Sequence, residues 1–405
     1  MNHKISFFAL IILIFDLSVL KAQVQLSRQN VFYQYDLTTP VQVQHKIAVG
    51  NDSAYVYVKI TTPSKASEAY TISYALKESY DGENSTLKGI VGVNDQIAAE
   101  GANAFYKIVI PSTGGNAFVL LTITNNAGET YYFDMPIRHE KDFPKTSLLV
   151  MEAQREIPVF DDYIHENDRF RVVSFGKEVQ QVHFFHYGTA FSPALPPMAT
   201  SAGKVQKDMT IDSTFSFSTR NTIAIQKRGL YFIQEDSTSL EGISIRVTDR
   251  YFPQIARVEE ITDPLIYIST AKEIRKLKSA EEIKKGMDRY WLDMTGSPER
   301  AKNIIKDYFT QVAKANHLFT TYKEGWKTDQ GLVLMIFGNP DEVYKTENAE
   351  EWIYNKSALM SKIRFTFAKV KNIFTNQHYD LIRNQSYDKE WFRMVDMWRK
   401  GRQEI

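Results

Sequence analysis

The chain has 405 residues, longer than one hydrophobic core usually serves, so two or three domains are expected. Its formal net charge of +1 excludes a protein that holds nucleic acid through a large excess of positive charge. The 25 Phe and 22 Tyr favour β-rich structure, because aromatic side chains pack well on a pleated sheet.

Residues 1–22 have the pattern of a secretory signal peptide. Lys4 supplies the positive start, an apolar stretch runs from Ile5 to Phe15, and Ala22 is the small residue at the exit. The alternative is an uncleaved N-terminal helix. Asp16 shortens the apolar run, and no later segment is apolar for long enough to predict a transmembrane helix. We therefore expect an exported protein, periplasmic or associated with the outer membrane. The lack of cysteine predicts that it is not lipidated.

Residues 23–143 are predicted to form a first β-sandwich. Short runs rich in β-branched and aromatic residues alternate with turn signals such as Asp81-Gly82 and the Asn125–Gly128 stretch. The predicted strands lie at 41–49, 55–58, 70–76, 105–110, 117–124 and 131–137. A charged connection with a proline, His139–Pro144, marks the boundary.

Residues 144–253 are predicted to form a second β-sandwich. Its strands are expected at 170–174, 179–187, 215–218, 222–226, 230–234 and 243–247. The proline-rich stretch Pro193–Pro197 cannot lie inside a strand ladder and predicts a long loop. No internal sequence repeat is evident.

Residues 254–405 contain the clearest helical patterns and are predicted to form an α+β domain. Ser279 with Glu282 has the spacing of a capping box, which predicts a helix start. Ser297 followed by Pro298 predicts a second start, and a last helix is expected from Asp388. Short strands are predicted at 352–354, 363–367 and 379–382.

One stretch of this last domain, Gly325–Tyr344, combines two turns with an apolar run. The first turn, Thr328–Gly331, has side chains that bond to nearby backbone and a glycine that tolerates positive φ. The run Leu332–Phe337 has the length and composition of a strand buried on both faces. Pro340 then sets the φ of a second turn.

These residues resemble the GWxTD-domain family of exported proteins typical of the Bacteroidetes-type envelope. The resemblance rests on Gly325-Trp326-Lys327-Thr328-Asp329, then Gly331, then Gly338-Asn339-Pro340-Asp341-Glu342 and Glu351-Trp352-Ile353-Tyr354. Upstream, Asp288-Arg289-Tyr290-Trp291 and Gly296-Ser297-Pro298-Glu299 fit further family segments in order. The resemblance covers 267–382. It marks as a structural motif the residues Gly325, Trp326, Thr328, Asp329, Gly331, Gly338, Pro340 and Trp352. It implies that the protein is located in the cell envelope, and it implies no activity.

A binding site is predicted around Trp326, Thr328 and Asp329, with Asp341 and Glu342 in the second turn. The alternative is that Thr328 and Asp329 only hold a turn, as such residues commonly do. A six-residue strand would separate the two turns by about 18–20 Å, which argues against a catalytic pair.

Other candidate sites are weaker. His183 and His186 would face opposite sides of a strand, so no metal site is predicted there. No nucleotide-binding or hydrolase motif appears, and no cofactor or catalytic residue is predicted. All five tryptophans lie in the last third, either as core or as a platform for stacking sugars.

The sequence therefore favours a non-enzymatic envelope protein that docks on other envelope or outer-membrane proteins. The alternatives are a hydrolase-type enzyme with its site at Trp326, Thr328 and Asp329, or a glycan-binding protein.

Overall fold

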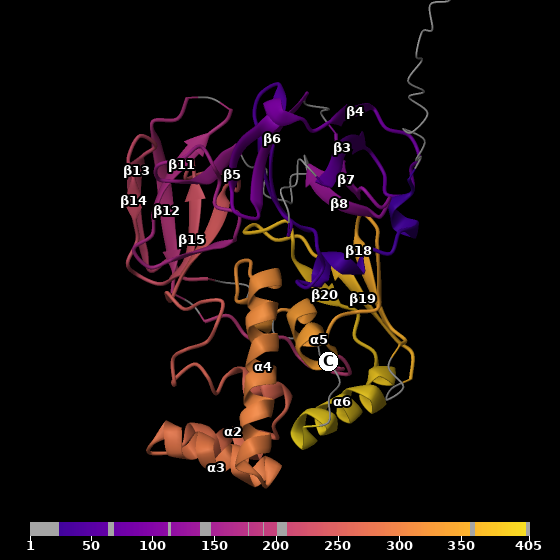
Figure 1. Cartoon of the computed structure of the whole chain (residues 1–405). Helices are drawn as coiled ribbons and strands as arrows, with labels where there is room; N and C mark the ends of the chain where they lie inside the picture. The colour runs from indigo at the N-terminus through magenta and orange to yellow at the C-terminus, as the bar shows by residue number, and fades with distance from the viewer. Residues whose placement is uncertain are drawn as a thin grey trace, which may run out of the picture.

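The structure is a computed structural model that describes residues 24–63, 69–111, 115–137, 147–176, 178–188, 190–200, 209–356 and 361–401. The expected signal peptide and the boundary at 139–144 lie outside these residues. Figure 1 shows two β-rich bodies side by side above a helical part, with a further small sheet beneath one of them. The chain is mainly β with a C-terminal α+β domain, as predicted.

The first β region is two antiparallel sheets, with strand orders β1-β2-β6-β5 and β4-β3-β7-β8. Alternate residues of β2, such as Val56 and Val58, and of β7, such as Val119 and Leu121, are fully buried between the sheets. The strands are β1 (Gln42–Val49), β2 (Ser53–Thr61), β3 (Tyr70–Lys77), β4 (Leu87–Ile90), β5 (Gln96–Glu100), β6 (Asn103–Pro111), β7 (Ala117–Asn125) and β8 (Thr130–Ile137).

The second β region pairs a five-stranded sheet, β10-β16-β15-β12-β13, with a three-stranded one, β14-β11-β9. Its strand pairs are antiparallel except β10 with β16. The strands are β9 (Leu148–Glu152), β10 (Tyr163–His165), β11 (Arg169–Ser174), β12 (Gln181–Tyr187), β13 (Ser213–Ser218), β14 (Ile223–Ala224), β15 (Gly229–Gln234) and β16 (Ile243–Thr248). Its apolar residues form a core of their own.

The C-terminal part packs helices against an antiparallel meander, β17-β18-β19-β20. The strands are β17 (Glu342–Lys345), β18 (Ala349–Tyr354), β19 (Ile363–Lys369) and β20 (Tyr379–Leu381). The helices are α2 (Ala271–Lys278), α3 (Ile283–Thr295), α4 (Pro298–Phe319), α5 (Asp329–Phe337) and α6 (Asp388–Lys400). Short 3-10 turns are η2 (Leu26–Arg28), η3 (Phe32–Tyr35), η4 (Val93–Asp95), η5 (Pro264–Tyr267), η6 (Gly325–Lys327) and η7 (Gln385–Tyr387).

The prediction of a strand at 332–337 is wrong, because these residues belong to helix α5. Every residue of α5 is buried, and a short apolar run does not distinguish a buried strand from a buried helix. The helix begins after Thr328, whose hydroxyl accepts a hydrogen bond from the Gly331 N–H (3.0 Å). It ends at Gly338, which has a φ of 77°.

The predicted helix start at Ser279 is also wrong. Ser279 ends α2, and α3 begins at Ile283 without a side-chain cap. The capping box of this region is Thr270 with Glu273, at the start of α2. The start at Ser297-Pro298 is confirmed, since the Ser297 hydroxyl accepts a hydrogen bond from the Arg300 N–H.

The first sandwich shares one continuous apolar core with the C-terminal domain. Residues 24–36 make the connection, because they precede the first sandwich in sequence yet pack on β17. The Val31 N–H donates to the Val343 carbonyl (2.9 Å), and the Asn30 carboxamide oxygen accepts from the Val343 N–H (2.9 Å). Tyr35 packs against Trp352 with ring centroids 4.8 Å apart.

Candidate functional site

The GWKTD segment, Gly325–Asp329, is a 3-10 turn that leads directly into α5. The Thr328 hydroxyl donates to the Gly325 carbonyl (2.7 Å) while it accepts from the Gly331 N–H. The Thr320 hydroxyl accepts from the Gly325 N–H (3.0 Å). The polar groups of Thr328 therefore hold the turn and cap the helix, which is the structural role weighed against a binding role above.

Two glycines of this motif are required by close backbone approach. A Cβ on Gly325 would lie 1.9 Å from the Ala315 carbonyl oxygen of α4. A Cβ on Gly331 would lie 1.9 Å from the Gly325 carbonyl oxygen. The segment is thus pressed between α4 and the first turn of α5, where no larger residue fits.

Asp329 is buried and forms an ion pair with Arg383, which follows β20. Its Oδ1 lies 2.5 Å from one guanidinium nitrogen, and its Oδ2 accepts from the Leu381 N–H (2.7 Å). Burial raises the pKa of Asp329, while Arg383 and the Leu381 N–H act in the opposite direction. The carboxylate therefore joins α5 to β20, and its acceptor sites are directed at protein groups.

Trp326 is 4% exposed, and its backbone N–H donates to the Asn316 carboxamide oxygen (3.1 Å). Its indole contacts Tyr267 edge-on, with centroids 6.2 Å apart. The other tryptophans, Trp291, Trp352, Trp391 and Trp398, are at most 3% exposed. The tryptophans therefore form core rather than a platform for sugars.

Asp341 and Glu342 lie at the far end of α5 from Asp329. Nine helical residues span about 13 Å, so the two sets of carboxylates are not brought together. The Asp341 carboxylate accepts from the backbone N–H groups of Asn355 (2.6 Å) and Lys356 (2.9 Å) and closes the β17–β18 hairpin. Glu342 accepts from the Tyr344 hydroxyl (3.0 Å).

A buried charge cluster not predicted from the sequence joins the first sandwich to β17 and β18. Lys345 lies 3.1 Å from the carboxylate of Asp134 and 3.5 Å from that of Glu350. Glu350 also accepts from the Tyr35 hydroxyl (2.7 Å) and from the Gln330 amide (2.9 Å). In the sequence, this cluster is indicated only by charged residues at positions of the strands that face the core and are otherwise apolar.

The ionisation of this cluster follows from its geometry. Burial alone would raise the pKa of Asp134, but the Lys345 charge and the Tyr80 hydroxyl lower it to about 2. The same carboxylates raise the pKa of Lys345 against the effect of its burial. Asp134 and Lys345 are therefore both ionised at neutral pH and hold two regions of the chain together.

A second ion pair fixes the second sandwich to the GWKTD segment. Arg246 of β16 lies 2.7 Å from Glu324 and donates to the Tyr322 carbonyl (2.8 Å). Lys327 also contacts Glu324, at 2.9 Å. Burial alone would raise the pKa of Glu324, but Arg246 and Lys327 lower it to about 2.

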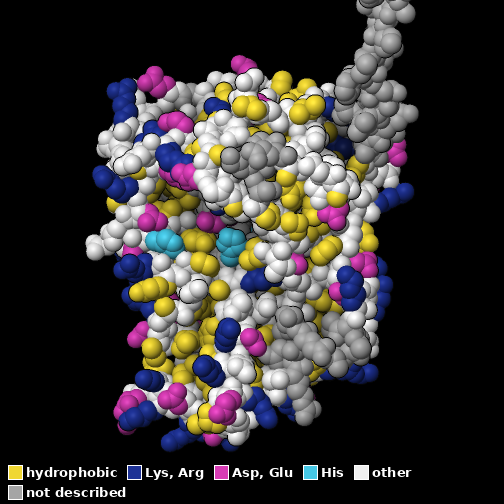
Figure 2. Space-filling model, in the orientation of Figure 1, with side chains coloured by type: hydrophobic (Ala, Val, Ile, Leu, Met, Phe, Trp, Pro, Cys, Tyr) yellow, Lys and Arg dark blue, Asp and Glu magenta, His cyan; other side chains and the backbone are white. Residues whose placement is uncertain are grey.

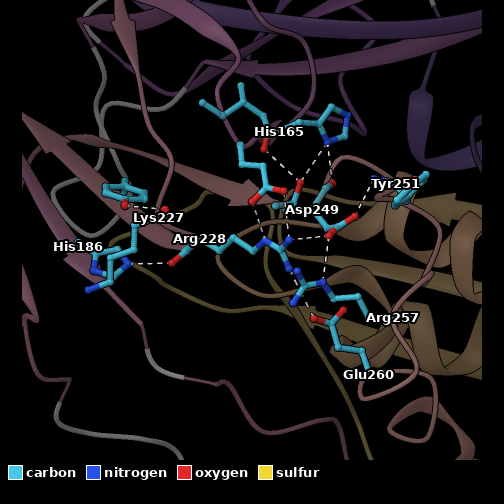
Figure 3. A network of polar contacts seen from close by, with 12 residues as sticks. His165, His186, Lys227, Arg228, Asp249, Tyr251, Arg257 and Glu260 are labelled. Atoms are coloured by element: carbon cyan, nitrogen blue, oxygen red, sulfur yellow. Dashed lines mark hydrogen bonds and ion pairs between the residues drawn. The ribbon is translucent and has the colours of Figure 1, made fainter.

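A third network surrounds Arg228, at the start of β15, and Figure 3 shows its side chain directed towards Asp249. Arg228 lies 2.6 Å from Asp249 and 3.2 Å from Glu166, while Arg257 binds the same Asp249 oxygen at 3.1 Å. Glu260 lies 3.9 Å from Arg228. The network holds two arginines and three carboxylates, and it links the second sandwich to the segment that leads into the helices.

His183 and His186 both lie in strand β12 and differ in exposure. His183 bonds to Ser216 at the surface, whereas His186 is fully buried and donates through Nε2 to the Arg228 carbonyl. Within the part of the chain that the structure describes, no three His, Asp or Glu side chains are grouped to hold a metal ion. No helix in this part is long and apolar enough to cross a membrane.

Fold and site together define a β-rich protein with a C-terminal α+β domain, whose GWKTD turn is a buried junction held by charge pairs. Residues 229–400 match the sequence model of the GWxTD domain, so the chain carries a domain of the GWxTD family. The match begins inside the predicted second β region, upstream of residue 254. Curated proteins gave no match.

Solved structures gave the following remote likenesses. A dimeric latent PorU from Porphyromonas gingivalis aligns with 53% of this chain and 21% of its own length, at 11% identity and a TM-score of 0.23. A chimeric titin Z1Z2 tandem aligns with 51% of this chain and 97% of its own length, at 11% identity and a TM-score of 0.16. A red sea bream transglutaminase aligns with 53% of this chain and 32% of its own length, at 11% identity and a TM-score of 0.18. None of these likenesses bears on function.

Proposed function

We propose that this chain is a non-enzymatic component of a bacterial cell envelope that docks on other envelope or outer-membrane proteins. The observation that carries the proposal is a set of three exposed apolar side chains on the first sandwich, Ile90, Val93 and Ile97, named here the edge patch. These side chains are 66%, 80% and 39% exposed. Fully burying a fully exposed side chain of this size is worth about 1.5–3 kcal/mol, and these partly exposed side chains would contribute a fraction of that.

The edge patch lies where the chain passes from one sheet of the sandwich to the other. Ile90 ends β4, Val93 lies in η4, and Ile97 lies in β5. Both β4 and β5 are edge strands, each paired on one side only. An edge strand offers unpaired N–H and C=O groups to a further strand, so we infer that the partner is a protein that contributes an apolar β-strand.

The state of the GWKTD segment supports docking over hydrolysis. Thr328 and Asp329 are buried, and their oxygens bond to backbone groups and to Arg383. A general base needs access to a substrate proton within hydrogen-bond reach. Charge supports a protein partner over nucleic acid, since Figure 2 shows Lys and Arg intermixed with Asp and Glu on the visible face.

The proposal is tested by affinity capture of the tagged full chain from gently solubilised envelopes. Val93→Lys places a charge in the edge patch, whereas Leu240→Lys makes the same change at a 73% exposed leucine in a turn of the second sandwich. We expect a defined set of envelope proteins to co-purify with the wild type and with Leu240→Lys, and to be lost with Val93→Lys. A chain that purifies alone, or partners that Val93→Lys retains, would refute the proposal.

A further inference from the structure

One unassigned feature of the molecule is a cleft where the two sandwiches meet the C-terminal domain. It has a volume of about 450 Å³, within the range of about 300–1,000 Å³ usual for small-molecule sites. His45 of β1, Tyr163 of β10, His317 of α4 and Gln377 line it. We name it the junction cleft. Two smaller hollows of about 130 and 170 Å³ adjoin it, and His45 and Gln377 line all three.

The charged groups of the junction cleft are already paired with one another. Lys46 forms an ion pair with Asp162. Lys59 donates to the Gln44 amide oxygen (3.0 Å), and the Gln44 amide donates to Asp161 (2.9 Å). Two lysines and two aspartates cancel in charge, so the cleft has no excess of either sign to select an ion.

Several other polar side chains of the cleft, by contrast, make no hydrogen bond within the described part of the chain. Within the described part of the chain, the side chains of His45, His317, Gln377 and Tyr163 have no hydrogen-bond partner. Burial lowers the pKa of His45 to about 4, so at neutral pH its ring is uncharged and offers one donor and one acceptor.

Aromatic residues also line the cleft: Phe160 is half-buried, and Tyr35 and Tyr163 are buried. Aromatic faces pack against C–H groups, while neutral imidazole, amide and phenol groups exchange hydrogen bonds with hydroxyls. An uncharged molecule with many hydroxyls meets both requirements. We propose that the junction cleft binds a neutral carbohydrate of one or two sugar units.

Other ligand classes fit the same cleft poorly. A phosphate or carboxylate would need a free cation, and Lys46 and Lys59 are engaged. A wholly apolar ligand would leave the imidazole and amide groups of His45, His317 and Gln377 without partners.

The inference is tested by saturation-transfer NMR and calorimetry on the full chain. The neutral probes are N-acetylglucosamine, galactose, mannose and their disaccharides, and glucose 6-phosphate is the charged probe. Gln377→Ala changes an exposed side chain of the cleft, and Gln385→Ala makes the same change at an exposed glutamine outside it.

We expect at least one neutral sugar to bind, with affinity about tenfold weaker in Gln377→Ala, as for the loss of one well-placed hydrogen bond. Gln385→Ala should bind like the wild type. No binding of any neutral probe, tighter binding of glucose 6-phosphate, or equal affinity in the wild type and Gln377→Ala would each overturn the inference. None of these outcomes depends on the edge patch.

Discussion

The buried carboxylate of Asp329 forms an ion pair with the guanidinium of Arg383. Breaking this ion pair tests whether Asp329 has a structural or a catalytic role. Asp329→Asn removes the charge and leaves that of Arg383 largely uncompensated. We expect it to lower the free energy of unfolding by roughly 3 kcal/mol. Urea denaturation followed by tryptophan fluorescence measures the change.

The matched control is Asp396→Asn, which breaks an exposed pair with Lys400 and should cost about 0.5 kcal/mol or less. The hydrolase alternative makes the opposite prediction for Asp329→Asn. If the variant kept wild-type stability and lost a measurable activity, the structural role of Asp329 would be refuted.

His45 gives a pH dependence whose sign is fixed by its burial. Its pKa is about 4 in the folded chain and about 6.5 when unfolded, so the unfolded state binds the proton more readily. Stability should therefore fall as pH decreases from 6.5 to 4, by about 2 kcal/mol from this group. His45→Gln should lose less stability over the same range, as measured by urea midpoints at each pH. Identical pH profiles would contradict a half-buried, neutral His45.

Single residues were predictable where their role is local. The turn chemistry of Thr328 follows from its residue type and its neighbours, and the structure confirms it. Arg383 as the partner of Asp329, and Asp134 as the partner of Lys345, lie 54 and 211 positions away in sequence. No spacing rule relates such pairs, because the fold alone brings them together.

Helix α5 is the element on which the GWKTD segment depends, and its tight contacts give a sharp prediction. Gly331→Ala would place a Cβ against the Gly325 carbonyl and force a backbone shift. We expect a loss of about 3 kcal/mol or more. Thermal unfolding of the purified variant is the measurement.

Gly115→Ala is the control for Gly331→Ala, because a Cβ at position 115 would have no atom within 4 Å. It should change stability by no more than about 0.5 kcal/mol. Equal effects of the two substitutions would show that α5 is not tightly packed on the 3-10 turn.

The misassigned strand at 332–337 shows where pattern alone fails. A run that is apolar at every position has no period, so it does not separate α from β. Thr328 and Asp329 are nevertheless good helix-start residues, and Gly338 is a good helix end. Reading these three signals together would have predicted α5. The long helices α4 and α6 were predicted because their apolar faces are periodic.

Across the whole molecule, the mainly β architecture with a C-terminal α+β domain was predictable from composition and turn spacing. The shared core between the first sandwich and the C-terminal domain was not, because residues 24–36 carry no signal that they pack on β17. The junction cleft was missed for the same reason, since its walls come from three distant regions of sequence.

The shared core predicts which regions unfold together. Ile123 and Ile233 are both fully buried, the first in the shared core and the second in the core of the second sandwich. All five tryptophans lie in the C-terminal part. Ile123→Ala should lower the urea midpoint of tryptophan fluorescence, as expected for a loss of about 2–5 kcal/mol, and Ile233→Ala should lower it less. Equal shifts would contradict two separate cores.

The central claim is that the chain works by binding another envelope protein through the edge patch, and site-specific photo-cross-linking in living cells tests it most directly. A photoreactive amino acid is placed at position 93, and at position 240 as the control. The account predicts a discrete cross-linked product from position 93, with an envelope protein as the partner, and none from position 240. No product at position 93, or the same products from both positions, would contradict it.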